Sequence, residues 1–329
     1  MQEYFRVVFS IDENFVDYLA VTIQSLIENA DINKKYIVSI LANGFSARSK
    51  RILSSFEKEN IKIEFYNVKE KLEELNIETL RETMHWSVAT YYRILIPFLF
   101  PDDKKVLYLD CDTVILDDVS KMFECDLEGN LIGAVIDYDT ECYTKSRIKY
   151  MIEDLKLKNY KNYFNAGVIL FDIEKIEKNE YLNQFMELMK RKFKFLDQDI
   201  LNIMFEDKTK LLDLEWNYQY HFIFPKFKKL YNLNTKEPKI IHYTTSTKPW
   251  NTPEFILCDL WWKFARKTPS YESIIYKNAS YEVIAALDVP IRFLYRFYKI
   301  ANLFAFGKIK KGIKGKIRKI KPCYDRLRK

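Results

Sequence analysis

The first 66 residues alternate short apolar runs with longer amphipathic runs, and this alternation limits the fold more than any other feature of the chain. The short runs predict strands, and the longer runs, whose apolar residues recur at helical spacing, predict helices. The predicted strands are residues 5–10, 36–42 and 61–66, and the predicted helices are residues 15–28 and 50–58. Strands separated by helices of this length indicate a parallel α/β sheet.

The same pattern continues through the body of the chain. Further strands are predicted at residues 105–109, 131–136, 164–171 and 239–243, with helices at 181–193 and 198–205. No internal repeat and no linker rich in Pro, Gly or Ser interrupts this pattern before about Pro269. The chain has 329 residues, 48% of them apolar, which is enough for a substantial core. We expect one domain over residues 1–268, a connecting segment over 269–290 and a separate tail over 291–329.

Glycine and cysteine usage excludes several function classes. The chain has seven glycines, three of them between Gly307 and Gly315, which leaves no glycine-rich phosphate loop of the dinucleotide-binding or P-loop type. The five cysteines include no C-x-x-C pair, and the first ten residues carry charges where a secretion signal would be apolar. No run reaches the roughly 18 apolar residues of a membrane span. We therefore expect a protein of the reducing cytoplasm.

The most informative segment is the strand at residues 105–109, which is followed by Asp110, Cys111 and Asp112. Side chains alternate along an extended chain, so the two carboxylates project to the same side. Ligands of open α/β sheets bind beyond the carboxyl ends of the strands, where this pair is expected. Two adjacent carboxylates repel each other unless a cation lies between them. A divalent metal such as Mn²⁺ or Mg²⁺ meets this requirement and can also hold a diphosphate.

The same segment also fits two other interpretations. Aspartates are common in a polar turn after a strand. Four apolar residues followed by D-x-D-x-[TV] is moreover the motif of haloacid dehalogenase-like phosphohydrolases, in which Asp110 would be the nucleophile and Asp112 an acid/base. That motif usually follows the first strand of its domain, whereas three predicted strands precede it here, and no G-D-x-x-x-D segment follows. The metal site is therefore favoured, and the phosphohydrolase is the alternative.

A second candidate segment lies near the end of the body. His242 ends an apolar strand, where an imidazole nitrogen could complete the coordination of a metal held by Asp110 and Asp112. Lys248 follows in a loop rich in Thr and Ser and could reach a diphosphate as a point charge. A lone histidine is more often structural, but the strand end and the following lysine favour a ligand. Asp137, just beyond its own strand, is expected at the same edge of the sheet.

Taken together, six segments in this order resemble glycosyltransferase family 8, the retaining α-glycosyltransferases that include bacterial lipooligosaccharide galactosyltransferases and the glycogenins. The similarity runs from Val7 to about Lys263. The segments are residues 10–20, 90–93, 107–112, 164–168, 196–202 and 242–250. The resemblance implies a GT-A, Rossmann-like nucleotide-sugar fold with a mostly parallel central sheet. One departure is Thr245, where many relatives carry a glycine.

The resemblance also implies a role for each matching residue. Asp12 and Asn14 would contact the uracil and the ribose, and Arg93 would reach the donor. The full set expected on the nucleotide sugar is Ser10, Asp12, Asn14, Arg93, Asp110, Cys111, Asp112, Asn165, Ala166, Asp197, Gln198, His242, Thr245 and Lys248. The metal ligands would be Asp110, Asp112 and His242, and the expected catalytic residues are Gln198, Asp197 and Asp137.

The implied activity is transfer of a hexose from UDP-galactose or UDP-glucose to a hydroxyl of a glycan or glycolipid acceptor, with Mn²⁺ or Mg²⁺ as the cofactor and with retention of the anomeric configuration. A retaining hydrolase places a carboxylate nucleophile beside the anomeric carbon. The family pattern puts Gln198 there, and an amide is a poor nucleophile. We therefore favour attack from the face of the leaving diphosphate, with Gln198 stabilising positive charge on the sugar.

The tail over residues 291–329 is strongly basic, whereas the rest of the chain is mildly acidic. Residues 291–329 hold 14 Lys and Arg against Asp325 alone, whereas the rest of the chain holds 39 cations and 45 anions. Apolar residues at helical spacing, from Phe293 to Ile320, alternate with these cations. A basic amphipathic segment of this kind is suited to an anionic membrane surface, so we expect peripheral attachment to the inner face of the cell membrane. Nucleic-acid binding through the tail is the second alternative, but the acidic body argues against it.

Overall fold

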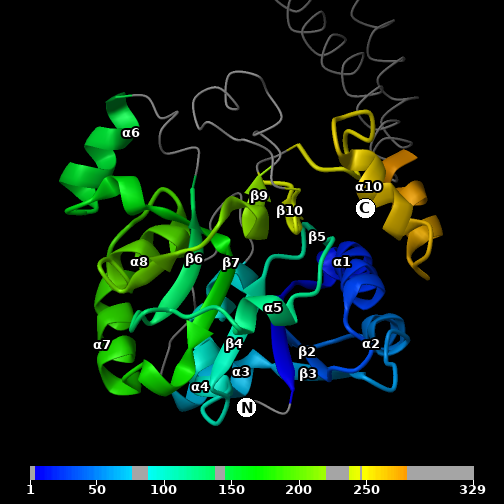
Figure 1. Ribbon diagram of the computed structural model, residues 1–329, viewed down its shortest axis with the longest axis horizontal. Helices are drawn as coiled ribbons and strands as arrows, with labels where there is room; N and C mark the ends of the chain where they lie inside the picture. The colour runs from blue at the N-terminus through cyan, green and yellow to red at the C-terminus, as the bar shows by residue number, and fades with distance from the viewer. Residues whose placement is uncertain (1–3, 76–87, 138–144, 220–236, 245–246, 280–329) are drawn as a thin grey trace, which may run out of the picture. The chain divides into compact units, whose positions relative to one another are not determined.

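The computed structural model describes residues 4–75, 88–137, 145–219, 237–244 and 247–279 (Figure 1). The chain divides into two compact units, Met1–Ser270 and Tyr271–Lys329. The first unit contains the sheets and the candidate site. In the second unit, the described residues 271–279 are helical. The basic amphipathic tail over 291–329 lies outside the described residues, so its helical character stays a prediction.

A seven-stranded sheet lies at the centre of the first unit, in the order β3-β2-β1-β4-β7-β6-β8. Its strands are β1 (Phe5–Ser10), β2 (Tyr36–Ala42), β3 (Ile61–Asn67), β4 (Lys105–Leu109), β6 (Ile132–Ile136), β7 (Phe164–Asp172) and β8 (Thr209–Leu211). Six of these strands run in one direction, and β7 runs against both of its neighbours, β4 and β6. The expected α/β fold with a mostly parallel sheet is therefore confirmed, with β7 as the reversed strand.

A smaller sheet of three strands lies beyond the end of β4. It consists of β5 (Thr113–Ile115), β10 (Ile240–His242) and β9 (Tyr218–Gln219), with β10 in the middle. β10 pairs antiparallel with β5 and parallel with β9. The strand predicted at residues 239–243 therefore belongs to this second sheet and not to the central one.

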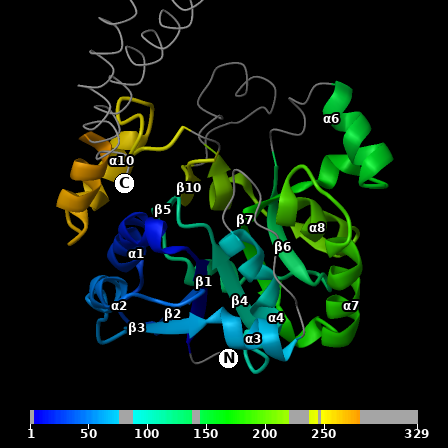
Figure 2. The ribbon, with the colours of Figure 1, turned by 180° about the vertical axis from the view of Figure 1, so that it is seen from behind.

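Helices cover both faces of the central sheet. The longest are α1 (Val16–Asn29), α2 (Ala47–Ser54), α7 (Lys178–Met189), α8 (Leu196–Met204) and α10 (Cys258–Ala265). The shorter ones are α3 (Val68–Glu74), α4 (Ile96–Leu99), α5 (Ser120–Phe123) and α6 (Lys145–Lys149), the 3-10 turns Glu13–Phe15, Val88–Leu95, Tyr160–Asn162, Ile173–Lys175 and Leu214–Asn217, and the π-turn Tyr150–Asp154. Both views place α1 and α2 at one end of the sheet and α7 and α8 at the other (Figures 1 and 2).

The alternation of side chains along β1 separates two apolar cores. Val7 and Phe9 pack in one core with α1, α2 and α5, whereas Val8 packs in the other with α4, α7 and α8. Each core forms because successive residues of a strand point to opposite faces of the sheet. Strands buried on both faces are typical of sheets that are covered by helices on both sides.

The helix boundaries differ from the predicted ones by a few residues. α2 spans Ala47–Ser54 instead of residues 50–58, because the Ser46 side chain caps its start by accepting from the backbone N–H of Ser49. The chain then turns at Lys58, whose backbone exchanges two hydrogen bonds with Ile61 at the start of β3. α7 also begins three residues before the predicted start.

Candidate metal and donor site

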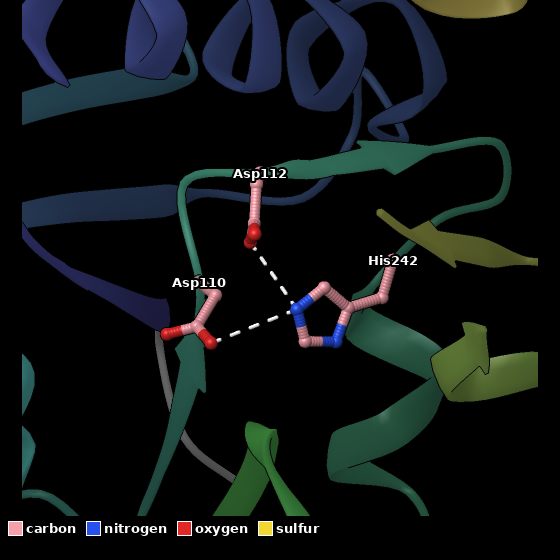
Figure 3. A group of neighbouring side chains, drawn as sticks. All are labelled: Asp110, Asp112 and His242. Carbon is pink, nitrogen blue, oxygen red and sulfur yellow. Dashed lines mark ion pairs between the residues drawn. The ribbon is translucent and has the colours of Figure 1, made fainter. Parts of the chain in front are cut away.

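The register of the two sheets brings Asp110, Asp112 and His242 together. Asp110 directly follows β4, and Asp112 directly precedes β5. In the antiparallel pair of β10 and β5, His242 lies opposite Thr113, the residue next to Asp112. Figure 3 shows both carboxylates turned toward the same ring nitrogen of His242.

These three side chains fit a divalent metal ion. His242 Nε2 lies 3.2 Å from Asp112 Oδ1 and 3.7 Å from Asp110 Oδ2. One ligand atom from each residue can be chosen so that all three lie within 4.8 Å of one another. Asp112 Oδ1 is buried and accepts no hydrogen bond from the described residues. Carboxylate oxygens and an imidazole nitrogen around a buried unsatisfied oxygen are a donor set suited to Mn²⁺ or Mg²⁺.

The space between the ligands exists because residue 167 is a glycine. A Cβ atom at Gly167 would lie 2.1 Å from His242 Cε1 and 2.8 Å from Asp110 Oδ2. Both distances are far below van der Waals contact, so any side chain here would displace the ligands. The carbonyl of Gly167 also accepts a hydrogen bond from the backbone N–H of Asp110 at 2.8 Å. Close approach of this kind is a recognised reason for a glycine within a strand.

Two neighbouring donors hold the other oxygen of Asp110. Tyr108 donates its hydroxyl to Asp110 Oδ1 at 2.7 Å, and Arg93 Nη2 lies 3.1 Å from the same atom. The Tyr108 hydroxyl lies 2.8 Å from Ser10 Oγ, so Ser10 supports the metal ligand through Tyr108. These contacts engage Oδ1 and leave Oδ2 facing His242. Ligating carboxylates are commonly oriented by hydrogen bonds of this kind.

Lys248 places a positive charge beside the same cluster. Its ammonium group contacts Asp112 Oδ2 and donates to the carbonyl of Tyr243. Burial opposes ionisation of Asp112, but Lys248 holds the pKa of this carboxyl well below its usual range. The loop that carries Lys248 is anchored two residues later, where the Trp250 ring stacks on Tyr18 with a centroid distance of 4.0 Å. The ammonium group of Lys248 is therefore fixed beside Asp112.

Arg93 connects this cluster to α8. Its Nε lies 2.9 Å from Asp197 Oδ2, and it also donates to the carbonyls of Thr90 and Ala166. Thr90 donates its hydroxyl to Asp197 Oδ1 at 2.6 Å. Burial raises the pKa of Asp197 to about 6, although Arg93 and Thr90 act in the opposite direction. Arg93 is 5% exposed, so it is a buried bridge between two carboxylates.

Gln198 is held by hydrogen bonds at both ends of its amide. Its Oε1 accepts from the backbone N–H of Ala166 at 3.0 Å, and its Nε2 donates to Asp137 Oδ2 at 3.0 Å. The Tyr163 hydroxyl lies 3.4 Å from the same Nε2. Leu196, at the start of α8, has a φ of 49°, a left-handed conformation that costs energy for a residue with a side chain. Such strain is often found beside functional residues.

The remaining predicted contacts lie near the same edge or outside the described residues. Asp12 and Asn14 follow β1, whose parallel pairing with β4 brings them to the carboxyl edge of the sheet. Asp12 accepts from the backbone N–H of Asn14 at 2.8 Å and so caps a 3-10 turn. Cys111 is partly buried between the two aspartates. Thr245 lies outside the described residues, so its contact with a phosphate stays a prediction.

Sequence reasoning missed several residues that build the site. Tyr108 had a usable signal, because residues 108 and 110 have the same parity along the chain and so face the same side. Tyr163 and Asn217 had none. Tyr163 follows a turn, Asn217 ends one, and the partners of both are distant in sequence. Asn217 is fully buried, and its Oδ1 lies 3.0 Å from His242 Nδ1.

Comparison with known proteins agrees with this fold. The GT-A fold is one of the folds of the glycosyltransferases. The family model described as "Glycosyl transferase family 8" matches residues 6–253, and the chain belongs to this family. No support remains for the phosphohydrolase, and the tail invoked for nucleic-acid binding lies outside the described residues.

Three similar proteins illustrate the relationship. General stress protein A of Bacillus subtilis is 29% identical over 76% of this chain and 88% of its own length. Lipopolysaccharide 1,3-galactosyltransferase of Salmonella typhimurium is 26% identical over 75% of this chain and 73% of its own. The structure titled WbbM bifunctional glycosyltransferase matches with a TM-score of 0.73 and 30% identity, over 84% of this chain and 52% of that one. The chain thus spans about half of that bifunctional protein.

One observation bears on membranes. Within the described ranges, no helix combines the length and the apolar character that crossing a bilayer requires.

Proposed function

We propose that this glycosyltransferase transfers galactose or glucose from a UDP-sugar to a hydroxyl of a glycan acceptor, with retention of configuration. The acceptor would belong to a bacterial cell-surface polysaccharide, lipopolysaccharide or glycoprotein glycan. The observation that carries the proposal is the cluster of Asp110, Asp112 and His242 with Lys248 beside it. The lipopolysaccharide galactosyltransferase and glucosyltransferase among its relatives support a hexose as the transferred group.

The proposed cofactor is Mn²⁺ or Mg²⁺ on Asp110, Asp112 and His242. Such a metal, when bound, offsets the negative charge that grows on the leaving UDP. Lys248 would bind the diphosphate as a second cation, and it is already held beside Asp112 by the Tyr243 carbonyl. Fixed charges in a partly buried site act more strongly than charges in water, because the effective dielectric is lower.

Gln198 is the proposed partner of the sugar. Its Oε1 accepts one hydrogen bond from Ala166, which leaves one lone pair of the carbonyl oxygen for a further contact. That lone pair could stabilise positive charge on the anomeric carbon as the glycosidic bond breaks. Asp137 fixes the other end of the amide, and Asp197 with Arg93 fixes the start of α8. The acceptor hydroxyl would then attack from the face that the diphosphate leaves.

Hydrolysis of a panel of UDP-sugars tests the proposal without knowledge of the acceptor. Purified protein should release UDP slowly from UDP-galactose or UDP-glucose when Mn²⁺ is present, and a chelator should stop the reaction. The Asp112→Asn variant provides the matched negative control. Absence of both donor hydrolysis and metal-dependent UDP binding in the unmodified protein would contradict the proposal.

We also propose that residues 291–329 attach the protein to the anionic inner face of the cell membrane. The support is the sequence pattern of this segment, with 14 Lys and Arg among periodic apolar residues. Deletion of residues 291–329 should release the protein from anionic vesicles while UDP-sugar hydrolysis continues. Equal vesicle binding by the truncated protein would contradict this role, and binding of the full chain to RNA but not to vesicles would favour the nucleic-acid alternative.

A further inference from the structure

His242 can bind a metal through Nε2 only when that nitrogen carries no proton. A neutral histidine carries its proton on either ring nitrogen, and the hydrogen bond made by the other nitrogen selects the tautomer. The ring is 3% exposed, so water is largely excluded as a partner. Its Nδ1 lies 3.0 Å from Oδ1 of Asn217, the last residue of the 3-10 turn Leu214–Asn217.

The direction of this hydrogen bond can be worked out from a backbone amide. The N–H of Gly167 can only donate, and it lies 3.0 Å from Asn165 Oδ1, so this atom of Asn165 must be the carbonyl oxygen. The same oxygen lies 2.9 Å from Asn217 Nδ2, so the group of Asn217 that faces it must be the amino group. The carbonyl oxygen of Asn217 therefore faces His242. Because a carbonyl oxygen can only accept, the proton lies on His242 Nδ1.

We propose that Asn217 is a positioning residue that fixes His242 in the Nδ1–H tautomer and so presents the bare Nε2 to the metal. The inference rests on the proposed metal-dependent function, and it assigns a role to a residue outside the three ligands. Asn217 is fully buried, so a reversed amide would place its carbonyl oxygen against the carbonyl oxygen of Asn165, with no water to relieve the repulsion.

The geometry around Nε2 agrees with this assignment. In the Nδ1–H tautomer, Nε2 carries no proton and lies 3.2 Å from Asp112 Oδ1 and 3.7 Å from Asp110 Oδ2, and Asp112 Oδ1 accepts no hydrogen bond from the described residues. A cation would stabilise an unprotonated nitrogen and two carboxylate oxygens this close together. Gly167 serves the arrangement twice, because its N–H starts the chain of hydrogen bonds and its missing side chain leaves room for the His242 ring.

The tautomer can be measured directly on the full chain without metal or nucleotide. The sequence contains three histidines, His85, His221 and His242, so ¹⁵N ring resonances can be assigned with the variants His85→Gln and His221→Gln. At a pH where the rings are neutral, His242 should show a protonated Nδ1 and an unprotonated Nε2. A proton on Nε2 in the unmodified protein would overturn the inference, whatever the activity of the enzyme.

Variants of Asn217 separate positioning from packing. Asn217→Leu removes both hydrogen bonds at similar volume, and we expect a mixture of tautomers and a loss of about 10- to 100-fold in Mn²⁺ affinity, measured by calorimetry with Mn²⁺ alone. Asn217→Asp keeps an acceptor for Nδ1–H, so it should retain the Nδ1–H tautomer. Asn60→Leu is the matched control, because Asn60 donates two hydrogen bonds to backbone carbonyls of the loop at Asp31 and Lys34.

The outcomes are distinguishable. A folded Asn217→Leu protein with an unchanged tautomer and unchanged Mn²⁺ affinity would overturn the inference, as would an equal loss of Mn²⁺ affinity in Asn60→Leu. If Asn217→Leu does not fold, the spectra of the unmodified protein and of Asn217→Asp decide the question. Failure of the unmodified protein to bind Mn²⁺ would contradict the proposed cofactor, whereas Mn²⁺ binding with a proton on free Nε2 would contradict only the role of Asn217.

Discussion

The two sides of the site use their polar atoms differently. On the metal side, Asp112 Oδ1 and His242 Nε2 face each other, and the carboxylate oxygen is buried without a hydrogen bond from the described residues. On the α8 side, Gln198 uses both ends of its amide within the protein, on Ala166 and Asp137. Asp197 likewise contacts Thr90 and Arg93. The first side is arranged for a ligand that is added. On the second side the Gln198 amide is already paired at both ends, and Asp197 is neutralised by Arg93, although its Oδ2 accepts no hydrogen bond from the described residues.

This difference predicts which substitutions weaken ligand binding and which lower the stability of the fold. A buried polar atom without a partner is costly, and a cation at the metal position removes that cost. Changes on the metal side should therefore weaken ligand binding more than they weaken the fold. Changes on the α8 side should disturb the position of Gln198 and the stability of the protein, because they break hydrogen bonds that already exist.

Arg93→Met should have the largest effect, because Arg93 joins the two sides by its contacts with Asp110 and Asp197. Removal of the guanidinium leaves the buried Asp197 carboxylate and the partly exposed Asp110 carboxylate without this counter-charge. We therefore expect a loss of about 3 kcal/mol in the free energy of unfolding. Urea denaturation measures it. The double variant Arg93→Met with Asp197→Asn should recover part of the loss, and a single-variant loss below about 1 kcal/mol would show that the two sides are independent.

Asp112→Asn should remove metal-dependent UDP binding while the protein stays folded. An amide is nearly isosteric with the carboxylate, but it carries no charge for the metal or for Lys248. We expect the Mn²⁺-dependent part of UDP affinity to fall more than about 100-fold, beyond the usual effect of a residue that only orients a ligand. Calorimetry with and without Mn²⁺ measures this. Asp117→Asn is the control, since Asp117 pairs with Lys121 on the surface.

Gln198→Ala should reduce sugar transfer much more than UDP affinity. Loss of one group that stabilises transition-state charge costs about 100-fold in rate. UDP affinity should stay within a few-fold, because the side-chain contacts of Gln198 are with Ala166, Asp137 and Tyr163. Rates with saturating donor, together with UDP titrations, separate the two effects. A parallel fall in UDP affinity would place Gln198 on the nucleotide, and Gln24→Ala on α1 controls for the substitution itself.

Asp197 should impose a modest dependence of stability on pH. Its pKa is raised from 3.8 to about 6 in the folded protein, mainly by burial. Between about pH 4 and pH 6 the folded state therefore keeps a proton that the unfolded state has released, so stability contributed by this group falls as pH rises. The slope is at most about 1.4 kcal/mol per pH unit. Urea denaturation across this range should show the slope in the unmodified protein and not in Asp197→Asn, and equal slopes would contradict the pKa assignment.

The sequence determined the elements that depend on local patterns. The bounds predicted for β2 and β4 match the structure, and a helix is found at α2, where one was predicted, with Ser46 capping its start. The D-x-D pair lies at the end of β4, as its alternation with the buried strand predicts. These features could be predicted because burial of alternate residues and capping of a helix start depend on neighbours in the chain.

The tertiary structure decided which distant segments meet. β7 is buried along its whole length, and a buried apolar run does not reveal the direction of its strand. Only the antiparallel pairing of β7 with β4 brings Asn165, Ala166 and Gly167 to the carboxyl edge beside Asp110. The pairing of β10 with β5 likewise sets His242 beside Asp112, and the turn before β9 delivers Asn217 to the ring. Direction, register and buried amide contacts depend on partners far apart in the chain, so local patterns could not specify them.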